Sequence, residues 1–329
     1  MKTALLRASD RLNDHEPTAP IAEELAASLA QAGEGRSGDV ACASAAEDAL
    51  RQFLAVDEGG SDALSTGFPK IDRHLGGGLR RGALYVLAAR PGIGKSALAL
   101  HLAHRAACSG HPVAFASLEM DAAECAGRLL TAISFVQRAY EKDCYDDRHR
   151  AKLRSAADDL RGCPITFMET REGTIDGIAA FLARENLRAA PRLLVVDYLQ
   201  LVSAPGHDNR VNEVGAVSRR LKLLAMQHAI PVLALSQLSR ALEVQQREPR
   251  LSDLRDSGGI EADADCVFLL SRVGEAATTT DLLKVRLAKN RSGPPAEEKL
   301  NFKKTSGTFE YHQPKRLSED EGADEGYGS

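Results

Sequence analysis

Short apolar runs alternate with longer amphipathic stretches through the middle of the chain. Apolar runs of five or six residues predict buried strands, and apolar residues that recur every three or four positions predict helices. The expected strands lie near 84–89, 113–118, 164–168, 193–197 and 231–236, and the expected helices over 95–107, 121–137, 174–187 and 211–228. This alternation favours an α/β fold in which a mostly parallel sheet is covered by helices on both faces.

The pattern changes beyond Ala262. Apolar runs at Cys266–Leu270, Leu282–Ala288 and Lys299–Phe302 are separated by turn residues rather than by helical stretches. Strands joined by short turns are antiparallel. We therefore expect an added set of antiparallel strands at one edge of the sheet.

The two ends of the chain differ from its middle. Residues 1–60 are Ala-rich and acidic, with helical patterns near Ile21–Ala32 and Ser44–Leu54. We expect a loose helical extension whose second helix is a candidate for packing on a neighbouring subunit. Residues 317–329 have almost no apolar content, which predicts disorder. The expected organisation is an extension over 1–60, one domain over 61–316 and a disordered acidic tail over 317–329.

Charge is unevenly distributed. The net charge is −4, but residues 1–60 carry −6 and residues 317–329 carry −5, which leaves +7 for residues 61–316. A surplus of this size is compatible with a polyanionic partner without requiring one.

The six cysteines form no Cys-x-x-Cys pair, so a zinc site is not expected. No apolar run approaches the ~18 residues that span a bilayer, and no signal peptide is evident. We expect a cytoplasmic protein without a membrane partner.

A Gly-containing turn joins the strand at 84–89 to the helix at 95–107. Backbone N–H groups and a helix N-terminus at such a turn can bind phosphate, while Lys95 reaches the β and γ phosphates and the Ser96 hydroxyl ligates Mg²⁺. Ala89 stands where the strict pattern has glycine, so the loop is a variant, and an ordinary strand-to-helix turn is the alternative. The candidate nucleotide-binding residues are Ala89, Arg90, Pro91, Gly92, Ile93, Gly94, Lys95, Ser96 and Ala97.

Three other strand ends carry polar side chains. Asp197 ends the run at 193–197 and could hold Mg²⁺, although an Asp that merely opens a turn would look the same. Glu119 follows the strand at 113–118, where a carboxylate can activate water or simply favour a helix N-terminus. Gln237 follows the strand at 231–236, where a neutral amide can sense a γ-phosphate or start a turn. The carboxyl ends of parallel strands meet at one edge, so these residues should gather beside Lys95.

Over residues 62–311 the chain resembles the ATPase domain of DnaB-type replicative helicases, within the RecA-like motor superfamily. The variant phosphate loop Ala89-Arg90-Pro91 is a form that this family uses. The other matching segments include Leu64-Ser65-Thr66-Gly67-Phe68, Gly76-Gly77-Gly78-Leu79, Ser117-Leu118-Glu119-Met120, Asp197-Tyr198-Leu199-Gln200, Ser236-Gln237-Leu238-Ser239-Arg240, Ser252-Asp253-Leu254-Arg255-Asp256-Ser257-Gly258 and Lys289-Asn290-Arg291-Ser292-Gly293-Pro294. The resemblance implies a RecA-like P-loop NTPase.

The resemblance also assigns roles to individual residues. It implies that Lys95 and Ser96 bind ATP and Mg²⁺, that Asp197 is the Mg²⁺ carboxylate, that Glu119 is the catalytic base and that Gln237 senses the γ-phosphate. Lys289 and Arg291 resemble residues that reach into a neighbouring subunit's site, where an arginine finger is worth ~10³-fold or more in rate. Without the resemblance, both would be taken as part of a solvated basic turn.

The family's contact with single-stranded DNA falls on the loop Arg255–Gly259 in this sequence. The resemblance makes Arg255, Asp256 and Gly258 the candidate DNA-binding residues: an arginine can pair with phosphate, and glycine lets backbone N–H groups approach the strand. Asp256 and Gly259 are departures, because family members usually carry Glu and frequently Ser there. With no Trp and 5% aromatic residues, base stacking is not expected to dominate binding.

The activity implied is that of a helicase that unwinds duplex DNA during replication. The family works as a homo-oligomeric ring, a hexamer, that moves 5′ to 3′ along single-stranded DNA by hydrolysing ATP. Sixty residues are too few for the separate N-terminal domain by which family helicases engage primase, so a primase or loader partner is left open. A RadA-type recombination or repair ATPase and a nucleotide-gated regulator of another helicase or initiator are the alternatives.

Overall fold

The structure is a computed structural model that describes residues 42–57, 62–137, 145–168, 173–206, 209–239, 247–254 and 258–313. Packing divides the chain into two units, Met1–Asp62 and Ala63–Ser329. In the first unit, the described part is helix α3 (Cys42–Asp57), on which Leu50 and Leu54 are 57% and 51% exposed. This helix covers the pattern at 44–54, whereas the expected helix near 21–32 and the tail at 317–329 lie outside the described residues.

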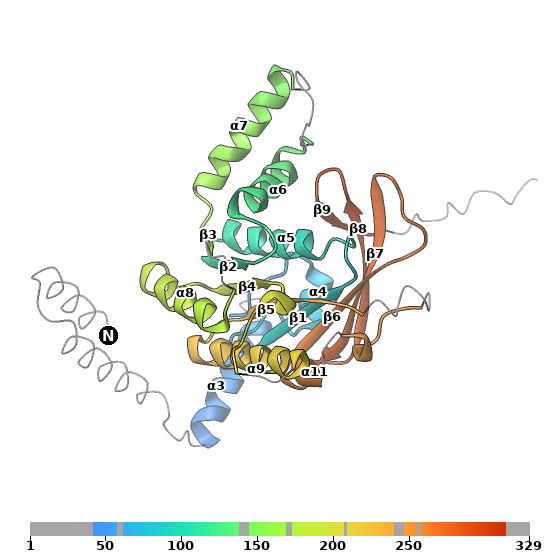
Figure 1. The fold of residues 1–329 in the computed structure, drawn as a ribbon. Helices are drawn as coiled ribbons and strands as arrows, with labels where there is room; N and C mark the ends of the chain where they lie inside the picture. Colours follow the sequence, from blue (N-terminus) through green and yellow to red (C-terminus); the bar gives the residue numbers. More distant parts are fainter. Residues whose placement is uncertain are drawn as a thin grey trace, which may run out of the picture. The chain divides into compact units, whose positions relative to one another are not determined.

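The second unit is built on a sheet of nine strands in the order β3-β2-β4-β5-β1-β6-β7-β8-β9 (Figure 1). The six strands from β3 to β6 are parallel, and β7, β8 and β9 extend the sheet in antiparallel fashion. Their bounds are β1 (Leu84–Ala89), β2 (Val113–Ser117), β3 (Ile165–Phe167), β4 (Leu193–Asp197), β5 (Val232–Gln237), β6 (Cys266–Arg272), β7 (Thr280–Asn290), β8 (Ala296–Lys303) and β9 (Thr308–Tyr311). The antiparallel part therefore begins one strand later than the pattern beyond Ala262 indicated.

Helices cover both faces of the sheet. They are α4 (Pro69–His74), α5 (Lys95–Cys108), α6 (Ala122–Ser134), α7 (Asp147–Arg161), α8 (Ile175–Arg188), α9 (Arg210–His228) and α11 (Gly258–Asp263), with short 3₁₀ turns η1 (Leu199–Leu201) and η2 (Leu251–Asp253). The sequence pattern did not predict α7, because most of its residues are charged and Ala156 is its buried residue. It also placed the end of α6 three residues too late, since Phe135 adopts a left-handed conformation with φ of 55°.

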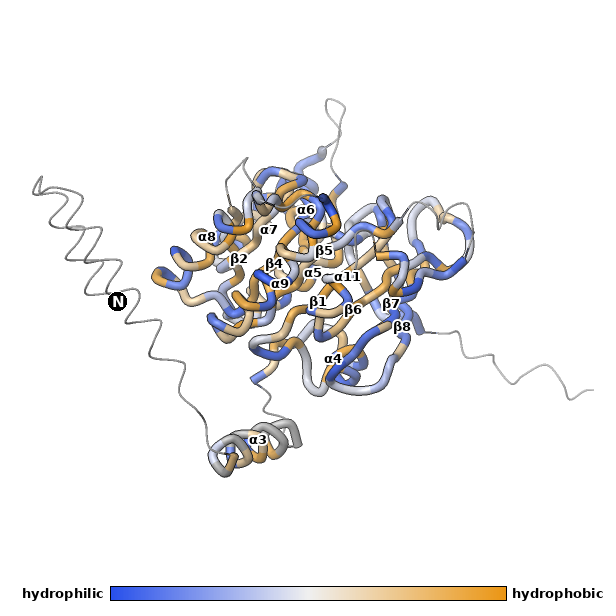
Figure 2. The backbone as a smooth tube through the Cα atoms, turned by 60° about the horizontal axis from the view of Figure 1, so that its bottom comes forward, coloured by the Kyte–Doolittle hydropathy of each residue, from blue (hydrophilic) through white to orange (hydrophobic). Residues whose placement is uncertain are grey.

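Two hydrophobic clusters lie on opposite faces of the sheet because successive strand residues point to opposite sides. In β1, Tyr85 and Leu87 face the cluster that contains α5, whereas Leu84 and Val86 face the cluster that contains α8, α9 and α11. Figure 2 shows these apolar segments gathered around β1, β4 and β5. Burial on both faces explains the continuous apolar runs and sets the carboxyl ends of these strands side by side.

Candidate nucleotide-binding site

The phosphate loop follows β1 and ends where α5 begins. Gly94 caps the helix with φ of 102°, a left-handed conformation, and the first turn of α5 contains no acidic residue. A Cβ added to Gly94 would lie 3.0 Å from the ring of Phe302, so a side chain there would strain the backbone and would also have to displace that ring. The loop thus presents backbone N–H groups and the positive end of a helix dipole to an anion.

Lys95 is held between an acid and an aromatic ring. Its Nζ lies 4.0 Å from Asp197 Oδ1 and 4.3 Å from the centre of the Tyr198 ring, and the two ionic side chains are only 12% and 0% exposed. Burial lowers the pKa of Lys95, although Asp197 and Glu119 oppose the shift. Burial likewise raises the pKa of Asp197, opposed by the Ser96 hydroxyl and by Lys95. A phosphate arriving at Lys95 would replace solvation that burial has removed.

The carboxylate of Asp197 is suited to a cation. Among the residues that the structure describes, none donates a hydrogen bond of normal geometry to either buried oxygen of Asp197. Two buried, unsatisfied carboxylate oxygens beside a serine hydroxyl are hard oxygen donors of the kind Mg²⁺ takes. No cluster of three His, Cys, Asp or Glu ligands occurs in the described ranges. Mg²⁺ at nucleotide sites is usually bound by one or two protein oxygens together with substrate phosphates and several waters.

The strand register brings Gln237 and Glu119 to the same edge. Gln237 pairs with Ala89 at the end of β1, and its backbone N–H donates to Gln200 Oε1 at 3.1 Å. Glu119, two residues beyond β2, is exposed. Both line a cavity of about 470 Å³ over the phosphate loop, together with Arg90, Pro91, Gly92, Gly94, Lys95, Ser96, Ala97, Met120, Glu124, Arg128, Tyr198 and Phe302.

Two residues of the expected nucleotide-binding segment do not line this cavity. Ala89 is 1% exposed inside the sheet, and Ile93 packs against the core. Arg90 lines the cavity, but its guanidinium donates to Leu238 O at 2.9 Å and so ties the loop to the exit of β5. A contiguous motif does not tell which of its residues turn inward.

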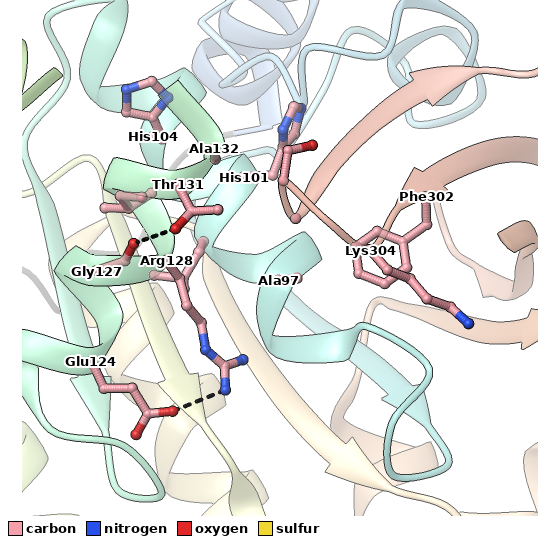
Figure 3. A pocket seen from close by; sticks show the side chains of 14 residues that line it. Ala97, His101, His104, Glu124, Gly127, Arg128, Thr131, Ala132, Phe302 and Lys304 are labelled. Carbon is pink, nitrogen blue, oxygen red and sulfur yellow. Dashed lines mark hydrogen bonds and ion pairs between the residues drawn. The ribbon is translucent and has the colours of Figure 1, made fainter. Parts of the chain in front are cut away.

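The structure adds site residues that the sequence did not single out. Tyr198 and Phe302 contribute ring faces, and Glu124 pairs with Arg128 at 3.0 Å across one turn of α6. The last two residues, with Ala97 and Phe302, also line a neighbouring groove of about 300 Å³ between α5, α6 and the turn after β8 (Figure 3). An i,i+4 acid–base pair usually marks a solvated helix face, and an aromatic residue in a strand usually belongs to the core. Neither feature therefore indicated a binding site in the sequence.

Lys289 and Arg291 lie at the end of the sheet where the parallel strands begin, opposite the carboxyl ends that carry the phosphate loop. Asn290, between them, pairs with Cys266, and Cys266 pairs with Tyr85 near the start of β1. The phosphate loop leaves the far end of β1, four residues later, or about 13 Å along the strand. Neither basic residue lines the cavity of its own chain.

Of the candidate DNA-binding residues, Arg255 and Asp256 lie outside the described residues. Gly258 is exposed and begins α11. On the other side of the loop, Leu254 forms a β-bridge with Leu238 at the exit of β5. Leu254, the last described residue before the loop, therefore lies near the end of β5 that borders the cavity.

The chain is similar to known proteins in sequence and in fold. Residues 63–311 match the family model described as the DnaB-like helicase C-terminal domain. The chain is 35% identical over 266 residues to the replicative DNA helicase DnaB of Geobacillus stearothermophilus, and 38% identical over 268 residues to that of Leifsonia xyli. These matches cover 78% and 76% of this chain but 58% of each helicase, so the chain spans little more than half the length of those relatives.

Solved structures agree. One of them, an isolated ATPase domain, superposes with a TM-score of 0.72 at 30% identity, covering 81% of this chain and 98% of that domain. A DnaB-like replicative helicase whose interactions with primase were studied superposes with a TM-score of 0.74 at 27% identity, covering 93% of this chain and 74% of that protein. By sequence and by fold, the chain belongs to the DnaB-like helicase C-terminal domain family.

Proposed function

We propose that this chain is an ATP-driven DNA helicase motor that works as a ring, moves 5′ to 3′ along single-stranded DNA and unwinds duplex DNA in replication. The observation that carries the proposal is a divided site. One edge of the sheet gathers the phosphate loop, Asp197, Glu119 and Gln237, and the opposite edge presents Lys289 and Arg291. Such an arrangement is complete only where two subunits meet.

The cavity supplies the chemistry of ATP hydrolysis. The phosphate loop and Lys95 would hold the β and γ phosphates, and Glu119 would orient a water and take its proton. Gln237 would contact the γ-phosphate, and its backbone link to Gln200 fixes the strand end from which the amide projects. Mg²⁺, held by Ser96 and Asp197, would neutralise charge on the phosphates.

The groove beside the cavity fits the nucleoside end of the substrate. It begins where Ala97 and Phe302 line both spaces, so a nucleotide whose phosphates lie on the loop can extend into it (Figure 3). Phe302 packs on Phe309 with ring centres 4.6 Å apart, which holds its orientation. Phe302→Leu should raise the KM for ATP about threefold or more with little change in kcat, because stacking on an aromatic face is lost while apolar volume is kept.

Ring assembly and DNA contact complete the proposal. Lys289 and Arg291 would enter the neighbour's cavity, and α3, with its exposed Leu50 and Leu54, would be a linker that packs on that neighbour. A hexameric ring would place the loops at Arg255, Asp256 and Gly258 around single-stranded DNA. No helix in the described parts of the chain is long and apolar enough to cross a bilayer. We place the motor in the cytoplasm.

The test combines hydrolysis with strand displacement. ATP turnover should rise when single-stranded oligonucleotide is added, and Lys95→Ala should abolish it. Forked duplexes with a single 5′ or a single 3′ tail distinguish the direction of movement, and unwinding should require the 5′ tail. Turnover that ignores DNA, without strand displacement, would instead support a nucleotide-gated regulator.

A further inference from the structure

The groove of about 300 Å³ that continues from the nucleotide cavity has histidine in its wall. His101 and His104 line it from successive turns of α5 (Figure 3), and Ala97, one turn before His101, lines both spaces. Four residues of helix span about 6 Å. A nucleotide whose phosphates lie at Lys95 and whose nucleoside enters the groove at Ala97 therefore presents its base to His101.

A row of aromatic side chains fixes the His101 ring. The ring stacks on Phe68 with ring centres 5.2 Å apart and meets Phe309 edge-on at 5.8 Å. Phe309 in turn stacks on Phe302 at 4.6 Å, and both Phe68 and Phe309 are buried. His101 and Phe302, which both line the groove, thus share one buried neighbour that fixes their positions relative to each other.

The imidazole of His101 is neutral and has unused hydrogen-bonding groups. Among the residues that the structure describes, none donates to or accepts from its ring nitrogens. Burial lowers the pKa of His101 to about 4, with Arg105 and His104 contributing, so the ring carries one N–H donor and one acceptor nitrogen at pH 7. Buried polar groups are normally hydrogen-bonded, and phenylalanine would fill the same space without that requirement.

The other polar side chains that line the groove already have partners. Glu124 pairs with Arg128, Thr131 donates to Gly127 O, Ser306 bonds to Thr308, Lys304 pairs with Asp281, and His104 lies 3.4 Å from Cys108 Sγ. Within the described part of the groove wall, His101 is therefore the side chain that offers both a donor and an acceptor to a ligand. A ring held in this way, beside an aromatic face, suits a nucleobase.

We propose that His101 recognises the base of the nucleotide: its acceptor nitrogen takes a hydrogen bond from the 6-amino group of adenine while Phe302 packs on the face of the base. A charged imidazole only donates and could not accept from an amino group. His101 is a specificity residue, because it touches the base and none of the reacting atoms. This inference rests on the proposed function, since it takes the cavity to be an ATP site.

A comparison of two nucleotides on the same protein tests the inference. Purine riboside triphosphate is ATP without the 6-amino group, and competition against a fluorescent ADP analogue gives the Kd of each. Wild type should bind ATP about 3- to 10-fold more tightly, the range expected of one hydrogen bond. In His101→Phe, which keeps the aromatic row and removes both nitrogens, this ratio should fall to about one. His101→Gln, whose amide restores an acceptor, should keep part of the preference.

His111→Phe is the matched control. His111 follows α5 and lines neither the cavity nor the groove, and phenylalanine keeps its backbone bond to Ala106 O. This variant should show the wild-type ratio. Equal binding of the two nucleotides by wild type, an unchanged ratio in His101→Phe, or a ratio of one in His101→Gln as well would refute base recognition by His101 and leave the proposed function standing. A wild-type protein that neither binds nor hydrolyses ATP would refute the proposed function itself.

Discussion

At the residue scale, the candidate site contains two buried charged groups whose desolvation is only weakly compensated. Lys95 is desolvated, and Asp197 keeps two buried oxygens that lack donors of normal geometry among the described residues. Buried charges of this kind cost stability unless they are paired. Their present pairing at 4.0 Å is loose, so a phosphate and a cation can each find a partner already in place.

The two glycines of the phosphate loop allow a controlled comparison. Gly92 and Gly94 both have positive φ, but a Cβ at Gly92 meets no atom within 4 Å, whereas one at Gly94 meets the ring of Phe302. Gly92→Ala should cost about 1–2 kcal/mol through backbone strain alone. Gly94→Ala should cost more and should also weaken ATP binding, as urea unfolding and nucleotide titration can measure. Equal losses of unfolding free energy and of ATP binding in the two variants would show that the Phe302 ring moves aside without cost.

His101 makes stability depend on pH. The ring stacks on Phe68 at 5.2 Å and meets Phe309 edge-on at 5.8 Å, and burial lowers its pKa to about 4, with Arg105 and His104 contributing. The unfolded chain takes up this proton near pH 6.5, whereas the folded protein does so only near pH 4. Unfolding therefore gains a proton between these values, and stability falls as the pH is lowered through that window.

The variant His101→Phe isolates this contribution. It keeps an aromatic ring in the stack and removes the titrating group. Between pH 7 and pH 4 the wild type should lose about 1–3 kcal/mol more unfolding free energy than the variant. Urea unfolding of both proteins at a series of pH values gives the difference directly. Parallel curves for the two proteins would assign the acid sensitivity to other groups.

At the scale of elements, substitutions at the N-caps of α6 and α7 distinguish an effect on stability from an effect on ATP binding. Asp121 accepts a hydrogen bond from Glu124 N at 2.7 Å, and Asp146 accepts one from His149 N at the same distance. Replacing either with alanine should cost about 1 kcal/mol. Only α6 carries cavity residues, so Asp121→Ala alone should also raise the KM for ATP, and Asn at either position should restore stability. A rise in KM for both variants would point to a general loss of order.

Most of the strands and the larger helices could be predicted because burial on both faces of a parallel sheet produces unbroken apolar runs. Asp197, Glu119 and Gln237 could be placed together for a related reason, since the carboxyl ends of such strands share one edge. Helix α7 could not be predicted, because its charged residues hide a narrow apolar stripe. Phe302 could not be assigned to the cavity either. It reaches the phosphate loop through the pairing of β7 with β8, and no local pattern encodes that pairing.

At the scale of the whole molecule, the positions of Lys289 and Arg291 lead us to expect that the proposed ATP hydrolysis requires a pair of subunits. Both lie at the edge of the sheet opposite the phosphate loop of their own chain, and both are engaged by α11. A chain that lacks Arg291 still has an intact cavity, and a chain that lacks Glu119 still has intact basic residues to offer. Two inactive proteins should therefore complement each other when they assemble together.

Co-expression of Arg291→Ala and Glu119→Ala chains under different affinity tags, followed by purification through both tags, yields mixed assemblies. A boundary is competent when its cavity comes from the Arg291→Ala chain and its basic residues come from the Glu119→Ala chain. With random assembly this holds for about a quarter of boundaries, so ATP turnover should recover to about a quarter of the wild-type rate if boundaries act independently. Assemblies that pair wild type with the doubly substituted chain provide the control, because they should retain a similar fraction. Mixed assemblies no more active than either variant alone would show that Arg291 acts within its own chain or not at all.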